Sequence, residues 1–172
     1  MKTKVSITIL LFFIILVLGC VNPFAPRLVN NMEGADLVVT AQKTPDEVLQ
    51  NFKIAYTFRD SLLYSDILDS NFVFYYFEPD LGTSGEIVKW HKDEDLYITG
   101  RLFRHFQIVD LIWNSDLYEW SDEQTGQISR SFSLTLIGED EDHKISGRAT
   151  FSLRKGADDR WRVTEWRDDS DI

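Results

Sequence analysis

Two neighbouring stretches decide the fold: residues 128–137 (ISRSFSLTLI) and residues 145–153 (ISGRATFSL). In both, apolar side chains alternate with serine, threonine or arginine. Successive side chains of a strand point to opposite faces of a sheet, so this pattern predicts two strands that each bury one face. The acidic residues 138–142 (GEDED) between them indicate a turn. The two stretches therefore predict an antiparallel sheet with one buried face.

Further strands are predicted on both sides of this pair. Residues 72–77 (FVFYYF) are dense in strand-forming residues, and residues 160–166 (RWRVTEW) form the last strand. Residues 107–114 predict another strand, and the polar residues 115–127 after it predict a loop. Residues 117–120 (LYEW) could instead extend that strand.

Helices are predicted before and between the strands. Residues 44–47 (TPDE) are typical of a helix start with Thr44 as the N-cap. Apolar side chains then recur at helical spacing as far as Tyr56. A second short helix follows Asp60, and a third begins at the acidic residues 93–95, whose charge suits the positive end of a helix dipole.

Two helices, a strand, a helix and a run of long strands make an α+β order. The opening at residues 44–49 (TPDEVL) and the close at 151–155 (FSLRK) and 160–166 resemble the nuclear-transport-factor-2-like superfamily, which includes ketosteroid isomerases, polyketide cyclases and scytalone dehydratase. The resemblance implies a cone-shaped, cystatin-like fold in which a curved antiparallel sheet wraps around the N-terminal helices. It covers residues 44–169 and leaves 170–172 as a polar tail.

The first twenty residues have the parts of a secretory signal: two lysines, an apolar block at residues 7–18, and a small residue at the end. Residues 17–20 (VLGC) resemble a bacterial lipobox. That resemblance implies cleavage after residue 19, a lipid on Cys20 and a tether at residues 20–43. An uncleaved anchor helix is the alternative. Cys20 is the chain's one cysteine, so it has no partner for a disulfide within the chain.

These features predict a protein of the cell envelope, held to the membrane by Cys20 with its domain outside the cytoplasm. In a bacterium with two membranes, Val21 in place of an aspartate favours the outer membrane. Removing the two lysines of residues 1–19 changes the formal net charge from −10 to −12. A domain this acidic repels nucleic acid, which we exclude as a partner. The sequence has no metal-binding motif, and no cofactor is expected.

Three residues are candidates for catalysis of the isomerase type, which needs a carboxylate base and acidic donors in an apolar pocket. Asp110 alternates with apolar residues and could share their face, or it could lie on the outer face of its strand. Glu165 could act as a base or pair with an arginine on a neighbouring strand. Tyr56 matches a position where enzymes of the superfamily hold a tyrosine, and it could equally be a core aromatic residue.

Aromatic side chains are the candidates for a ligand pocket. Tyr56, Trp90, Trp113 and Phe132 could line the mouth of the cone or fill its core. The leading hypothesis is a membrane-anchored exported lipoprotein that binds a small apolar ligand or a protein partner and is not catalytic. One alternative is a small-molecule enzyme of the isomerase, dehydratase or hydrolase type. Another is a structural module that forms a homodimer through the open face of its sheet.

Overall fold

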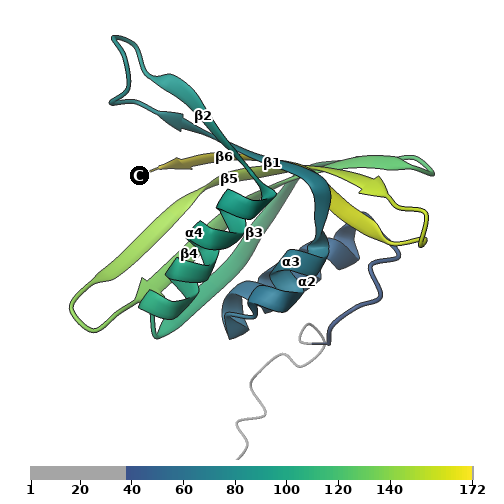
Figure 1. Cartoon of the computed structure of the whole chain (residues 1–172), viewed down its shortest axis with the longest axis horizontal. Coiled ribbons are helices and arrows are strands. Elements are labelled where there is room, and N and C mark those ends of the chain that lie inside the picture. Colours follow the sequence, from purple (N-terminus) through teal and green to yellow (C-terminus); the bar gives the residue numbers. More distant parts are fainter. Residues whose placement is uncertain (1–37, 172) are drawn as a thin grey trace, which may run out of the picture. The chain divides into compact units, whose positions relative to one another are not determined.

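The computed structural model describes residues 38–171, so the predicted signal peptide, Cys20 and most of the predicted tether lie outside the described residues. Three helices lie on one face of a curved six-stranded sheet (Figure 1). The elements are helices α2 (Pro45–Phe58) and α3 (Ser61–Ile67), strands β1 (Leu68–Glu78) and β2 (Glu86–His91), helix α4 (Lys92–His105), and strands β3 (Ile108–Ser121), β4 (Thr125–Ile137), β5 (Asp142–Lys155) and β6 (Trp161–Asp171).

The strands lie in the order β2-β1-β6-β5-β4-β3. Adjacent strands are antiparallel except β1 and β6, which are parallel. The sequence predicts only antiparallel pairs, because its signals are short turns, and a short turn makes the two strands that it joins antiparallel. No hairpin joins β1 to β6, since the rest of the domain lies between them in the chain. Their direction is therefore set by how the whole chain packs.

The alternating stretches form β4 and β5, and their apolar face is buried as predicted. Ile128 pairs with Phe151, and both are fully buried. Helix α2 begins as predicted, with the Thr44 hydroxyl accepting a hydrogen bond from the Glu47 amide at 3.2 Å. Its apolar side packs on this face, where Phe52 meets Phe151 with ring centroids 5.3 Å apart. Burial of aromatic and aliphatic side chains between the helices and the sheet stabilises the domain.

The last strand contains a β-bulge that changes which side chains face the helices. Val163 pairs with Leu153, but Glu165 pairs with Ser152, so Thr164 is an extra residue on β6. The Thr164 hydroxyl donates a hydrogen bond to the Ser152 carbonyl at 3.1 Å. An extra residue in a strand reverses the alternation beyond it. Past the bulge, Trp166 and the even-numbered residues face inward.

The described part of the predicted tether is packed on the domain. The Thr40 amide donates to Asn51 Oδ1 at 2.8 Å, and Asn51 donates back to the Thr40 carbonyl at 3.2 Å. Gln42 is fully buried, and its carbonyl accepts from the Trp161 amide at 2.8 Å. The domain therefore includes residues 40–43, which the sequence assigns to the tether, because this segment pairs with α2 and β6.

Two further boundaries differ from the sequence prediction. Strand β3 runs to Ser121 rather than ending at residue 114, which confirms the alternative that residues 117–120 extend it; its second half pairs with β4 across two bulges. Strand β6 runs to Asp171, so residue 170 belongs to the sheet and not to a polar tail. Ser170 pairs with Gly147 on β5. Backbone pairing with β5 holds this polar segment in the strand.

Gly147 lets the end of β6 approach β5 closely. A Cβ added at Gly147 would lie 2.5 Å from Ser170 Cα and 2.6 Å from the Asp169 carbonyl oxygen. Both are backbone atoms that cannot move without shifting the strand. We expect Gly147→Ala to destabilise the domain by roughly 1–3 kcal/mol, as other overpacking substitutions do.

The matched control is Gly100→Ala in α4, where an added Cβ meets only the end of the Arg104 side chain, at 3.4 Å. Alanine favours helix by about 0.5–1 kcal/mol over glycine, so this variant should be more stable than the parent. Urea unfolding of the full-length chain measures both. Equal effects of the two substitutions would contradict the close approach at Gly147.

Candidate functional site

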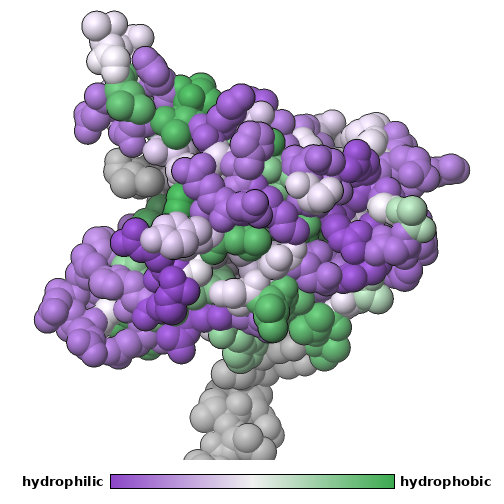
Figure 2. Space-filling view, viewed as in Figure 1, coloured by the Kyte–Doolittle hydropathy of each residue, from purple (hydrophilic) through white to green (hydrophobic). Residues whose placement is uncertain are grey.

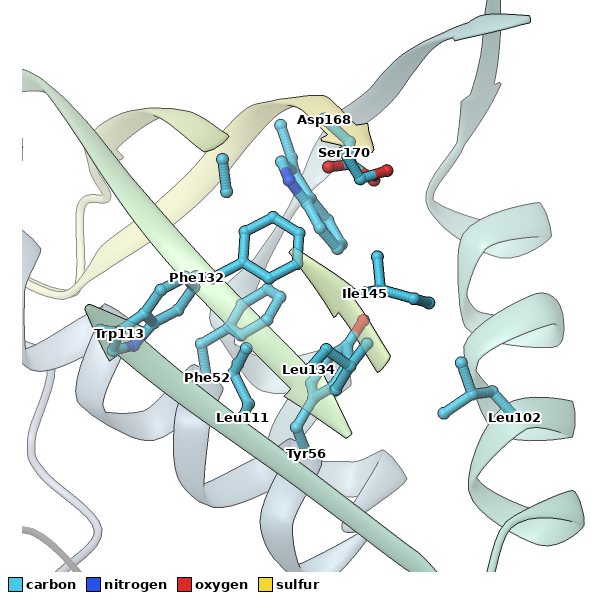
Figure 3. A pocket seen from close by; sticks show the side chains of 12 residues that line it. Phe52, Tyr56, Leu102, Leu111, Trp113, Phe132, Leu134, Ile145, Asp168 and Ser170 are labelled. Atoms are coloured by element: carbon cyan, nitrogen blue, oxygen red, sulfur yellow. The ribbon is translucent and has the colours of Figure 1, made fainter. Parts of the chain in front are cut away.

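A cavity lies between the inner face of the sheet and the helices, with a volume of about 180 Å³. Figure 3 shows side chains from α2, α4 and four strands around it. Most of its lining is apolar, and its polar groups lie on β6 and at Tyr56. The lining residues are Phe52, Tyr56, Leu102, Leu111, Trp113, Phe132, Leu134, Ile145, Ala149, Trp166, Asp168 and Ser170.

Local structure explains how these side chains converge. Phe52 and Tyr56 are four residues apart on α2, so they lie on one side of the helix, and their rings stack with centroids 4.8 Å apart. Phe132 and Leu134 are two residues apart on β4 and share its inner face. Figure 2 shows hydrophobic residues in green in the indentation between the β2 hairpin and the β4–β5 hairpin.

The polar end of the cavity is built by β6 after its bulge. Trp166, Asp168 and Ser170 are two residues apart and face the same side of the sheet. The Ser170 hydroxyl donates to Asp168 Oδ2 at 3.2 Å. Asp168 Oδ1 and Trp166 Nε1 are buried and have no hydrogen-bond partner among the described residues. Unpaired buried polar atoms are rare in folded proteins because each costs free energy, and here an acceptor and a donor border the same cavity.

The surroundings of Asp168 raise the pKa of its carboxyl group. Burial raises the pKa of Asp168 to about 6, the hydrogen bond from Ser170 opposes this rise, and the charge of Asp169 adds to it. Asp168 is thus largely ionised at neutral pH and becomes protonated just below it. Chemically, such a carboxylate can bind a cation, accept a hydrogen bond or exchange a proton with a bound molecule.

A second buried carboxylate, Asp95 on α4, has hydrogen-bond partners for both of its oxygens. Its two oxygens accept hydrogen bonds from the Tyr64 hydroxyl at 2.8 Å and from Trp90 Nε1 at 3.0 Å. Burial raises the pKa of Asp95, and these two hydrogen bonds oppose that rise. Burial also raises the pKa of Tyr56 well above its usual range, so its hydroxyl stays neutral. Asp95 joins three elements and does not line the cavity.

Comparison with known proteins identifies the fold. No protein-family model matches the chain, and no curated protein matches its sequence. A conserved protein of Planctomyces limnophilus has a similar structure, with a TM-score of 0.63 at 12% identity over 73% of this chain and 92% of that one. A nuclear transport factor 2-like superfamily protein of Salmonella enterica gives 0.59 at 11% identity, covering 73% and 87%. The domain has the nuclear-transport-factor-2-like fold.

Another similar structure with this fold is a protein of Novosphingobium aromaticivorans provisionally described as a scytalone dehydratase. It gives a TM-score of 0.60 at 8% identity, covering 74% of this chain and 81% of that one. At these identities the likeness concerns the fold, which is shared by proteins of many functions. What the site does must therefore be argued from its own residues.

Three of the four pocket candidates line the cavity: Tyr56, Trp113 and Phe132. Trp113 is fixed by its Nε1, which donates to the Leu49 carbonyl at 3.3 Å. Trp90 does not line it. The Trp90 ring stacks on Phe74 at 4.7 Å, and its N–H bonds to Asp95, so Trp90 is a packing residue.

The two carboxylates proposed from the sequence lie outside the cavity. Asp110 is exposed on the outer face of β3, while its neighbours Val109 and Leu111 are buried. Glu165 accepts a hydrogen bond from Arg167 Nε at 2.7 Å, so it pairs with an arginine as predicted, but on its own strand rather than on a neighbouring one. Neither meets Tyr56, so the sequence-based acid–base set of Asp110 or Glu165 with Tyr56 is not assembled. The physical reasons are the alternation of β3 and the bulge in β6.

Sequence reasoning missed Asp168. The alternation of Trp166, Asp168 and Ser170 carries a weak signal for a strand, but the acidic neighbours suggest a solvated end to the chain. Within residues 38–171, no group of three or more histidine, cysteine or acidic residues could hold a metal ion. No helix in the same range is long and apolar enough to cross a membrane.

The raised pKa of Asp168 makes stability depend on pH. Its contribution to folding is fully present below the ordinary value of 3.8 and is lost as pH rises through about 6. Asp168→Asn keeps the shape and removes the charge. We therefore compare the unfolding free energy of Asp168→Asn with that of the parent at two pH values. The difference between variant and parent should shift in favour of the variant by roughly 1–3 kcal/mol from pH 4 to pH 8.

Urea unfolding of the full-length chain across this pH range measures the effect. Asp169→Asn is the matched control, because Asp169 is exposed and pairs with Arg148 Nη2 at 2.7 Å. This control should lose a small amount of stability and keep most of the parent's pH dependence in that window, because burial, and not the charge of Asp169, is the main cause of the raised pKa of Asp168. A parent-like pH dependence in Asp168→Asn would contradict the assignment.

Proposed function

We propose that this domain binds a small molecule with a ring-sized apolar body and one polar end, and that it does so outside the cytoplasm on a lipid anchor. The observation that carries the proposal is the cavity with unpaired polar atoms at one end. Its volume of about 180 Å³ is close to the ~150 Å³ of an engineered apolar cavity that accepts benzene. A single ring or a short branched chain therefore matches its size.

The distribution of polarity supports binding of an amphipathic molecule. Leu111, Phe132 and Ile145 offer apolar surface, where burying a ligand's carbon atoms yields about 25 cal/mol per Å². At the other end, Trp166 offers a hydrogen-bond donor and Asp168 an acceptor. A ligand that pairs with both removes the cost of leaving them unpaired. Specificity in small-molecule sites commonly arises from a few such polar groups in an apolar wall.

The anchor forms the other half of the proposal and rests on the sequence of residues 1–20. Cys20 lies two residues after the apolar block, behind Gly19, and several acyl chains would hold the protein firmly to a membrane. Residues 21–37 separate Cys20 from the segment that contacts α2, and this length would let the domain stand away from the bilayer. The site would then lie outside the cytoplasm and bind its ligand there.

Filling the cavity tests the binding proposal. Leu134 lines the cavity, and Leu134→Trp places a larger side chain inside it. We expect this variant to lose affinity for benzyl alcohol, a ring with one hydroxyl, by about tenfold or more. Saturation-transfer NMR on the full-length protein in lipid nanodiscs, corrected with empty nanodiscs, measures binding.

Ile112→Trp is the matched control, because Ile112 is 46% exposed on β3 and does not line the cavity. It should bind benzyl alcohol like the parent. Circular dichroism and thermal unfolding check that both variants fold. Equal binding by a folded Leu134→Trp would show that the probe binds elsewhere and would contradict the proposal.

Replacing the lipidated residue tests the anchor. Cys20→Ser removes the thiol that would carry the lipid. In bacterial cells fed a labelled fatty acid, we expect the parent to carry the label and to sediment with membranes. The variant should lose the label. A variant that still carries the label, or a parent that never acquires it, would contradict lipidation at Cys20.

A further inference from the structure

We infer that the ligand of this cavity is a small organic cation, namely a primary or secondary ammonium attached to an aromatic or alicyclic ring. The inference rests on the proposed function and deepens it by naming the charge and chemical class of the ligand. It starts from the Asp168 carboxylate, which faces an apolar cavity with one oxygen buried and unpaired.

The chain supplies no countercharge at this site. Among the described residues that line the cavity, none is lysine, arginine or histidine. The two nearest arginines along β6 and β5 are engaged elsewhere. Arg167 bonds to Glu165 and lies over the Tyr75 ring at 5.0 Å, and Arg148 bonds to Asp169. A buried carboxylate is usually paired with a positive charge, so a bound cation would complete this site.

The walls of the cavity suit an ammonium group as well as a ring. Five aromatic residues line the cavity: Phe52, Tyr56, Trp113, Phe132 and Trp166. The faces of such rings carry negative potential and attract cations. Trp166 Nε1 adds a free donor. An ammonium whose ring or neighbouring carbon carries a hydroxyl or carbonyl oxygen would satisfy both Asp168 and Trp166.

The net negative charge of the protein also favours a cationic ligand. The formal net charge is −12 once residues 1–19 are removed, so the domain attracts cations and repels carboxylates and phosphates. A neutral alcohol could donate a hydrogen bond to Asp168 but would leave its charge uncompensated. A bare metal ion needs several oxygen or nitrogen ligands, and only one carboxylate lines this cavity among the described residues.

Binding of an ammonium should depend on the ionisation of Asp168. The titratable groups around it are Asp169 on the same strand, Tyr56 from α2, and Tyr76, which pairs with Asp168 in β1. From β5 its partner is Ala149, which carries no charge. Because burial holds the pKa of Asp168 at about 6, the carboxylate is anionic at pH 7.5 and mostly protonated at pH 5.

The test compares benzylamine with benzyl alcohol, which share a ring and differ in charge. Benzylamine stays protonated at both pH 7.5 and pH 5. Isothermal titration uses the full-length protein in nanodiscs of zwitterionic lipid, corrected with empty nanodiscs. We expect benzylamine to bind about tenfold or more tightly than benzyl alcohol at pH 7.5, and this preference to fall about tenfold at pH 5.

Variants assign the preference to one carboxylate. Asp168→Asn should remove the preference for benzylamine at pH 7.5, because it should weaken benzylamine about tenfold more than it weakens benzyl alcohol. Asp169→Asn removes an acidic charge next in sequence, outside the cavity, and should keep the preference. Leu134→Trp should weaken both probes.

The outcomes separate this inference from the proposed function. If benzyl alcohol binds as tightly as benzylamine and Leu134→Trp weakens both, the cationic class is wrong and the binding function stands. If folded Asp168→Asn keeps the preference, Asp168 does not select the cation and the inference is overturned. If neither probe binds the parent, both the inference and the proposed ring-sized ligand are overturned.

Discussion

The cavity depends on one extra residue in the last strand. With Thr164 inserted opposite the Ser152–Leu153 step of β5, the alternation of β6 reverses, so Val163 and then Trp166 face the helices. In an unbroken ladder, Glu165 and Arg167 would follow Val163 inward. Two long charged side chains would then occupy the space now lined by Trp166 and Asp168. Because of the bulge, the ion pair of Glu165 and Arg167 lies on the outer face, and the Trp166 ring and the Asp168 carboxylate line the cavity.

The two buried carboxylates of the domain differ in how they are satisfied. Asp95 receives hydrogen bonds from Tyr64 and Trp90, and it ties α4 to α3 and β2. Asp168 has one hydroxyl donor, from Ser170, and its second oxygen has no partner in the described chain. The first arrangement stabilises the fold, whereas the second costs stability at neutral pH. A cost of this kind is expected where a protein keeps a polar group ready for a ligand.

Several elements could be predicted from the sequence because their signals are local. The cap at Thr44, the second cap at Asp60 and the alternation of β4 and β5 depend on residues close together in the chain, and each appears where expected. The inward positions of Tyr56 and Phe132 follow from the same periodicities. From the sequence, the Asp110 side chain could lie on either the inner or the outer face of β3. Burial of Val109 and Leu111 on the inner face shows that Asp110 lies on the outer face.

The sequence by itself determined the α+β order, the buried face of the central hairpin and the aromatic content of the core. These depend on helical and strand periodicity, which a short window of residues carries. Only the tertiary structure decided that β1 runs parallel to β6, that residues 40–43 belong to the domain, and that Asp168 rather than Asp110 or Glu165 faces the cavity. Each of these depends on pairing between segments far apart in the chain. A single inserted residue reverses the faces of a strand, and no local sequence pattern indicates where such a residue lies.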